Sequence, residues 1–228
     1  MAVYTKIDIQ DLLFLSDSYK LGKITKFKGI KKGIENTNYL LKTDKKNFIL
    51  TIFEKRVQKK DLPFFMNLME KLNQKKIICP KPLKNSKGKH LSRIRKKPAS
   101  IVTFLSGADK VNLNYKNCYD VGKNIAKFHK VTAKIKLYRE NSMSIKKLGG
   151  LLKNIKFKSN KISSKLKPTL NMCLKDIKNQ WPKKLPSGII HGDLFIDNIF
   201  FNKNKFSGFI DFYFSSNDYL MYEIAICI

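Results

Sequence analysis

The chain has 228 residues, of which 43% are hydrophobic, so it can bury a core of its own and is not a disordered tail. Its formal net charge of +30 raises the expectation of a nucleic-acid or anionic-membrane partner. Only four of the 47 basic residues are arginines, however, and because phosphate and base readers rely on the guanidinium fork, the composition favours a lysine-rich surface over nucleic-acid binding.

The first half of the chain predicts short strands and one helix. Apolar patterning indicates an antiparallel meander of three strands over residues 24–29, 37–43 and 47–54. Spacings of three and four then predict a helix whose apolar face carries Leu62, Phe65, Met69 and Leu72. After two proline breaks, residues 99–105 predict a further strand, and the glycine that follows marks a hinge near residue 106.

The second half predicts helices and one hairpin. Helical spacing recurs at two sets of apolar residues, Cys118, Val121, Ile125 and Phe128, and Leu170, Cys173, Ile177 and Trp181. Residues 139–167 are polar and weakly periodic, which indicates a long connection with one short helix. The order predicts an α+β fold of two lobes: a small antiparallel β lobe over residues 1–106 and a larger, mainly helical lobe over residues 107–228.

The polar residues around the second hairpin carry the chemistry. An apolar strand ends at Ile190, and a polar loop, a β-hairpin and a further carboxylate follow it. Because a hairpin returns the chain to its start, we expect Asp193, Asn198 and Asp211 to face one cleft. Phosphoryl transfer needs an aspartate to orient the substrate hydroxyl, and an amide and a second carboxylate to hold magnesium.

The alternative is that these three residues have ordinary structural roles. Asp193 would then cap a helix, Asn198 would lie in a turn and Asp211 would be a surface carboxylate. The neighbours of Asp211 argue against this, because four of the five other residues between positions 209 and 214 are aromatic and an unpaired carboxylate among them would be costly to bury. A bound metal would remove that cost.

The motif itself resembles that of a known family. The sequence His191-Gly192-Asp193, followed by Asn198 and then by Ile210-Asp211-Phe212, resembles the signature of the aminoglycoside-phosphotransferase-like kinases. The resemblance implies a protein-kinase-like fold, ATP and Mg²⁺ as cofactors, Asp193 as the catalytic base, and Asn198 and Asp211 as the metal ligands.

Further segments narrow the resemblance to one branch of that family. The segments that resemble the homoserine kinases of this fold are residues 1–5, 29–30, 33–39, 48–56, 61–65 and 210–214. The Phe-Tyr-Phe after Asp211 separates that branch from its relatives. The implied reaction is phosphorylation of the homoserine hydroxyl on the route to threonine. Choline, methylthioribose or an aminoglycoside is the alternative acceptor, and a lysine-rich RNA-binding protein is the alternative class, although no stripe of alternating aromatic and basic residues supports it.

The same resemblance implies where the nucleotide binds. Gly29 and Gly33 flank the turn between the first two strands, where backbone amides would approach the phosphates unless the glycines serve turn geometry alone. Kinases of this fold carry a Lys or Arg on the third strand, but its centre here is Leu50-Thr51-Ile52. Lys55 or Arg56 at the end of the strand is the expected substitute, unless both belong to an exposed basic face.

Two further expectations concern the residues that bind the adenine and the acceptor. Thr103, Phe104 and Leu105 occupy the position of the adenine-binding hinge. Asn217 and Asp218, just after the metal aspartate, are candidates for binding the ammonium or hydroxyl group of the substrate, with a solvated turn as the alternative.

The cysteines and the apolar runs predict a cytoplasmic protein. Cys79, Cys118, Cys173 and Cys227 lack the spacings of metal or disulfide sites and are expected to be buried thiols. No run approaches 18 uncharged apolar residues, so no membrane span is predicted. The chain ends inside an apolar helix that begins near Tyr219, which predicts a C-terminally truncated form with exposed apolar surface and little activity.

Overall fold

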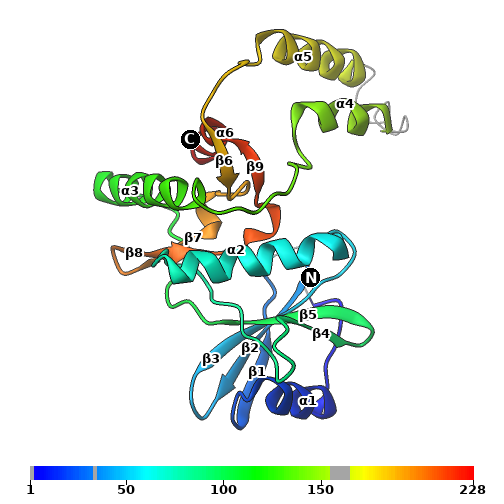
Figure 1. Ribbon diagram of the computed structural model, residues 1–228, viewed down its shortest axis with the longest axis vertical. Coiled ribbons are helices and arrows are strands. Elements are labelled where there is room, and N and C mark those ends of the chain that lie inside the picture. The colour runs from blue at the N-terminus through cyan, green and yellow to red at the C-terminus, as the bar shows by residue number, and fades with distance from the viewer. Residues whose placement is uncertain (1–2, 33–34, 155–164) are drawn as a thin grey trace.

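The computed structural model describes residues 3–32, 35–154 and 165–228 and shows an α+β architecture (Figure 1). A five-stranded antiparallel sheet has the order β1–β2–β3–β5–β4. Its strands are β1 (Ile24–Gly29), β2 (Thr37–Thr43), β3 (Asn47–Ile52), β4 (Leu91–Ile94) and β5 (Lys97–Thr103). The first two match the predicted strands in both bounds, whereas β3 ends two residues early and β5 is shifted towards the N-terminus.

One face of the sheet packs on helix α1 (Ile9–Tyr19), which was not predicted from the sequence. Leu12 and Leu15 of this helix are buried against Leu41, Leu50 and Ile101 of the sheet. A capping box of Asp8 and Asp11 begins the helix, because each side chain accepts a hydrogen bond from the backbone N–H of the other residue. This box was one available signal, and the helical spacing of the three buried residues, Leu12, Leu15 and Tyr19, was another.

The second helix, α2 (Leu62–Gln74), lies between the sheet and the rest of the chain (Figure 1). The four residues of its predicted apolar face are all at most 2% exposed. They belong to a second core that also holds Val102 of the sheet and Phe128 of α3 (Tyr115–Thr132). The amphipathic pattern thus predicted both this helix and the face that it buries.

Two short antiparallel pairs complete the part of the fold that positions the site. β6 (Ser187–Ile190) pairs with β9 (Ser216–Tyr219), and β7 (Ile199–Asn202) pairs with β8 (Lys205–Phe209). The last helix, α6 (Leu220–Cys227), follows β9 directly. The hairpin β7–β8 was predicted, and so was a helix that begins near Tyr219.

The helices α4 (Ile145–Asn154) and α5 (Leu166–Gln180) pack on each other at the far end of the molecule (Figure 1). The first is the short helix expected in the polar connection. The predicted apolar face of α5 is not buried, because within the part of the chain that the structure describes this helix makes few contacts besides those with α4. Cys173 on α5 and Cys118 on α3 are exposed, which corrects the expectation of four buried thiols; Cys79 is buried and Cys227 is half-buried.

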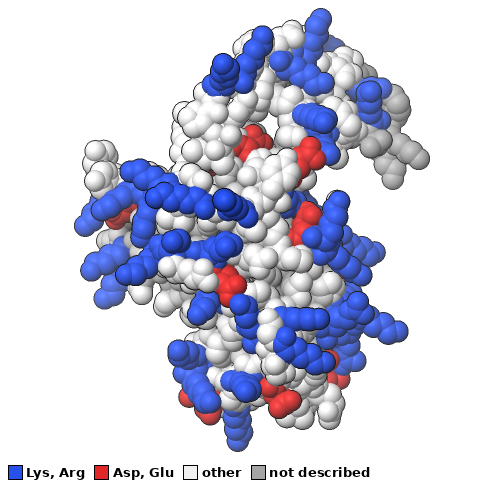
Figure 2. Space-filling view, in the orientation of Figure 1, with Lys and Arg blue, Asp and Glu red and all other residues white. Residues whose placement is uncertain are grey.

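The basic residues are distributed over the surface. On the face shown in Figure 2, Lys and Arg side chains cover elements from the sheet to α5, with few acidic groups between them. No single basic stripe stands out on this face. Among the described residues, no helix combines the length and apolar character needed to cross a membrane.

Candidate functional site

The loop between β6 and β7 brings two of the three predicted site residues into contact. The Asn198 side chain donates from Nδ2 to Asp193 Oδ2 at 3.0 Å and to the Asp193 carbonyl oxygen at 2.7 Å. A single turn of 3₁₀ helix, Ile196–Asn198, shapes the loop so that Asn198 turns back towards Asp193. Because its amide nitrogen makes both of these bonds, the Asn198 amide oxygen remains as the atom that a cation could bind.

The hairpin β7–β8 returns the chain to the same place. The Ile210 backbone N–H donates to the Asn198 carbonyl oxygen at 3.0 Å, so the residue before Asp211 is tied to the start of the hairpin. Asp211 itself has a φ of 63°, a left-handed conformation that a non-glycine residue adopts only where its surroundings hold it. The three residues therefore gather as the sequence predicted.

The surroundings of this site disfavour the ionised form of its carboxyl groups. Burial raises the pKa of Asp193 to about 6, and the charges of Glu35 and Asp197 add to the shift, while the hydrogen bond from Asn198 opposes it. Solvent reaches the Asp211 side chain, but the protein atoms crowded around its carboxylate, together with Asp193 and Glu35, raise its pKa to about 7. Carboxylates that disfavour one another's charge favour a bound cation.

The donor set fits magnesium better than a metal held by protein alone. Within the described ranges, no group of three or more His, Cys, Asp or Glu side chains is arranged to hold a metal. Mg²⁺ prefers oxygen ligands and commonly takes only one or two from the protein, with phosphates and water completing its shell. The Asp211 carboxylate and the Asn198 amide oxygen match that pattern.

A buried carboxylate on α6, which the sequence reading missed, supports the loop. Glu223 is 0% exposed; its Oε2 accepts from the His191 backbone N–H and its Oε1 accepts from the Gly192 N–H at 3.1 Å. The signal was a glutamate inside an otherwise apolar helix. His191 contributes a second tie, because its Nε2 lies 2.8 Å from the Ile210 carbonyl oxygen, which favours a structural role for this histidine.

The glycine and lysine proposed to contact the nucleotide lie at one end of the sheet. Gly29 ends β1, where a Cβ atom would come 2.7 Å from Val3 Cγ2, so the N-terminal segment packs closely on this glycine. Gly33 lies outside the described residues. Lys55 is exposed just beyond β3.

The predicted adenine segment continues β5. Thr103 is the last residue of that strand, and its Oγ1 accepts from the Lys81 N–H at 2.9 Å. Phe104 is exposed and Leu105 is half-buried. The following residues are attached to the hairpin, because Ala108 and Phe201 exchange two backbone hydrogen bonds of 2.8 and 3.0 Å.

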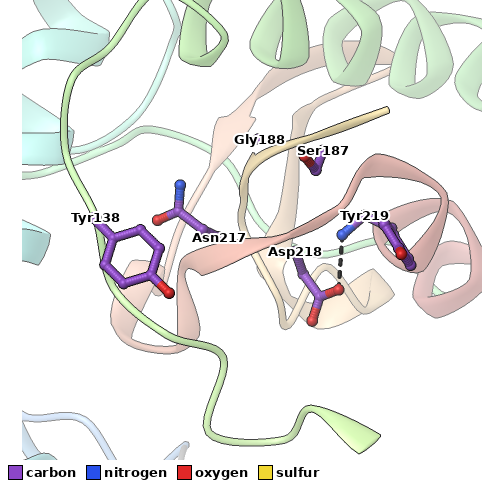
Figure 3. A pocket seen from close by; sticks show the side chains of 6 residues that line it. All are labelled: Tyr138, Ser187, Gly188, Asn217, Asp218 and Tyr219. Carbon is purple, nitrogen blue, oxygen red and sulfur yellow. Dashed lines mark hydrogen bonds between the residues drawn. The ribbon is translucent and has the colours of Figure 1, made fainter. Parts of the chain in front are cut away.

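Asn217 and Asp218 lie on β9 and line a hollow of about 320 Å³ (Figure 3). Tyr138, Ser187, Gly188 and Tyr219 complete its lining. Asn217 Oδ1 accepts from the Arg139 N–H at 2.9 Å, and Asp218 Oδ2 accepts from Asn141 Nδ2 at 2.6 Å. Both side chains thus already hold neighbouring segments. In the β6–β9 register, Asn217 lies opposite Ile189 and Asp218 opposite Gly188, one and two positions further from the catalytic loop than Ile190.

Comparison with known proteins agrees with this geometry. Residues 26–228 match the model of the phosphotransferase enzyme family. The chain is 40% identical over its whole length to a homoserine kinase of Sinorhizobium medicae, of which it spans 70%, and 41% identical to a homoserine kinase of Paramagnetospirillum magneticum, of which it spans 72%.

Solved structures of kinases share the fold. An amicoumacin kinase in complex with AMP-PNP, Ca²⁺ and its ligand aligns with a TM-score of 0.76 at 17% identity, over 97% of this chain and 68% of that one. A spectinomycin phosphotransferase in complex with ADP and spectinomycin aligns with a TM-score of 0.69 at 13% identity, over 97% and 74%. These likenesses confirm the predicted α+β, protein-kinase-like fold. The chain therefore belongs to the phosphotransferase enzyme family, and it is a kinase.

Proposed function

We propose that this kinase transfers the γ-phosphoryl group of ATP to the hydroxyl of L-homoserine, forming O-phospho-L-homoserine for threonine biosynthesis in the cytoplasm. Relatives at 40 and 41% identity over the whole chain carry the name homoserine kinase, which supports this acceptor over choline, methylthioribose or an aminoglycoside. The observation that carries the chemistry is the contact between Asp193 and Asn198, with Asp211 held beside them by the Ile210 hydrogen bond.

In this proposal Asp193 accepts the proton of the acceptor hydroxyl while the hydroxyl oxygen forms a bond to the γ-phosphorus of ATP. The bond between that phosphorus and the bridging oxygen breaks, and ADP leaves. A pKa of about 6 suits the task, because the carboxylate is mostly ionised near neutral pH yet basic enough to hold a proton. Asn198 keeps the Asp193 carboxylate oriented. Asn198 and Asp211 would hold Mg²⁺, which when bound neutralises charge on the phosphates.

The nucleotide would bind between two lobes, residues 1–106 and residues 107–228. We assign Thr103, Phe104 and Leu105 to the adenine, and Gly29, Gly33 and Lys55 to the phosphates. Neighbours of the same fold bind AMP-PNP with Ca²⁺, or ADP, which supports a nucleotide and a divalent cation here. Asn217 and Asp218 remain candidates for contact with the acceptor.

A panel of acceptors tests the proposal. The chain, and a version extended at its C-terminus to the length of the homoserine kinases that it matches, are each incubated with ATP, MgCl₂ and L-homoserine, choline, methylthioribose or kanamycin in turn. ADP release is measured alongside ³¹P NMR of the products. We expect a phosphomonoester signal with homoserine, lost when EDTA removes the metal and restored by Mg²⁺. Turnover on another acceptor with none on homoserine would overturn the assignment.

A further inference from the structure

Two charged residues meet beyond one end of the sheet. In the β2–β3 pair, Thr37 lies opposite Ile52. Glu35 precedes this pair by two residues and Arg56 follows it by four, so both leave the same end of the ladder. They form an ion pair between Arg56 Nη1 and Glu35 Oε1.

A separate, more buried carboxylate holds the backbone segments that carry Glu35 and Arg56. Glu54 Oε1 accepts from the Thr5 and Thr37 hydroxyls at 2.7 Å each, and Oε2 pairs with Lys97. The Glu54 N–H also donates to Asn36 Oδ1 at 3.4 Å. These bonds hold the backbone on either side, while the Arg56 and Glu35 side chains stay 56% and 21% exposed and thus open to a ligand.

Packing connects this pair to the catalytic aspartate. The Arg56 guanidinium lies 5.1 Å from the centroid of the Phe214 ring. The Phe214 backbone packs on Gly192, where an added Cβ would come 2.8 Å from the Phe214 carbonyl oxygen. Gly192 directly precedes Asp193. Two packed residues, Phe214 and Gly192, therefore connect Arg56 to Asp193. In agreement with this placement, the charge of Glu35 raises the pKa of Asp193 and that of Arg56 lowers it.

We propose that Arg56 and Glu35 form the recognition site for the acceptor amino acid, with Arg56 binding its carboxylate and Glu35 its ammonium group. This inference rests on the proposed function, because it concerns an acceptor that is a zwitterion. A four-carbon hydroxy amino acid spans only about 5 Å between its hydroxyl oxygen and its carboxylate, judged from standard bond lengths. The groups that bind it must therefore lie close to Asp193, as this pair does.

The chemistry of the pair favours a zwitterion over the phosphates of the nucleotide. A glutamate beside Asp193 and Asp211 repels a phosphate chain but attracts an ammonium group. When a zwitterion binds, each protein charge exchanges one partner for another, so neither is left unpaired in the site. In a chain with only four arginines, one of them stands here, where its planar fork matches a carboxylate bidentately.

Truncated acceptors separate the two contacts. Steady-state kinetics are measured for wild type, Arg56→Gln, Arg56→Lys and Glu35→Gln with L-homoserine, 3-aminopropan-1-ol, which lacks the carboxylate, and 4-hydroxybutanoate, which lacks the ammonium group. Each truncated acceptor is measured as a substrate or, where turnover is too slow, as a competitive inhibitor. We expect Arg56→Gln to raise the KM for homoserine roughly 10- to 100-fold, as loss of a charged hydrogen-bond partner does, and to leave 3-aminopropan-1-ol unaffected.

The complementary variant gives the opposite pattern. Glu35→Gln should weaken the binding of homoserine and 3-aminopropan-1-ol and leave the binding of 4-hydroxybutanoate unaffected. The KM of Arg56→Lys for homoserine should fall between those of wild type and Arg56→Gln. The KM for ATP should stay constant throughout. Arg95→Gln is the matched control, because Arg95 also pairs with acids, Asp8 and Asp11, but beside α1. Thermal unfolding of each variant confirms that it is folded.

The possible failures are distinguishable. Wild-type protein that phosphorylates another acceptor and not homoserine would refute the proposed function. Wild-type turnover of homoserine with unchanged KM in both variants would leave that function standing and refute the recognition site. A raised KM for ATP with an unchanged KM for homoserine would also refute it, by assigning Arg56 to the nucleotide phosphates.

Discussion

Glu223 offers the sharpest test of how the catalytic loop is positioned. Its carboxylate is fully buried and accepts hydrogen bonds from two successive backbone amides, those of His191 and Gly192. In Glu223→Gln the amide oxygen can still accept one bond, but the NH₂ group faces the second N–H, donor against donor. A buried donor without a partner costs about 1–3 kcal/mol, and Glu223→Ala would leave two, about 2–6 kcal/mol of the roughly 5–15 kcal/mol that stabilises a domain.

Activity should fall along with stability, because Gly192 directly precedes Asp193. A displacement of the base by about 1 Å can cost roughly 10²-fold in rate, so we expect Glu223→Gln to lower kcat by roughly 10- to 100-fold. Urea unfolding measures the stability, and phosphotransfer under conditions where the variant is fully folded measures kcat. Glu140→Gln is the control, since Glu140 pairs with Lys147 at the surface. A Glu223→Gln enzyme with wild-type kcat and midpoint would refute this reasoning.

Three further predictions concern individual carboxylates. Asp193→Asn should lower kcat by roughly 10²- to 10⁴-fold with nucleotide affinity, measured by titration calorimetry, nearly unchanged; comparable turnover would exclude it as the base. Asp211→Asn should raise the Mg²⁺ concentration for half-maximal rate, because an amide is an uncharged ligand, and an unchanged titration would remove Asp211 from the metal site. Glu54→Gln should destabilise the fold by about 1–3 kcal/mol at pH 7 in urea unfolding. Burial raises the pKa of Glu54, but hydrogen bonds from Lys97, Thr5 and Thr37 give a net decrease, so this stabilisation is present above its ordinary value of 4.5 and is lost as the pH falls through the lower folded value. A difference between Glu54→Gln and wild type that persists at low pH would contradict the argument.

Local patterns predicted the elements whose own residues determine them. The strand β2 alternates in burial and α2 presents a continuous apolar face, so their positions follow from the sequence. The gathering of Asp193, Asn198 and Asp211 also followed, because a hairpin brings together the residues on either side of it whatever the remainder of the fold.

Features that depend on tertiary contacts were not predicted. The apolar positions of α5 have the same helical spacing as those of α2, yet none of its residues is buried, because spacing defines a face without specifying what covers it. Glu223 was missed for the converse reason. A glutamate in an apolar helix signals a buried partner, but only the folded chain shows that the partners are two backbone amides 31 and 32 residues away.

Net charge was the least informative feature of the sequence, because the candidate site is acidic whereas the chain as a whole is basic. The chain carries +30 overall, yet the charges of Glu35 and Asp197 lie close enough to raise the pKa of both Asp193 and Asp211. Well-separated surface lysines are screened by solvent and salt, whereas neighbouring, partly buried groups such as Glu35 and Asp193 are screened less. A local acidic cluster in a basic protein attracts a divalent cation and an ammonium group, and the surrounding positive field raises the local concentration of ATP. The reaction proposed above needs both, and only the arrangement of these residues in space allows one chain to provide them.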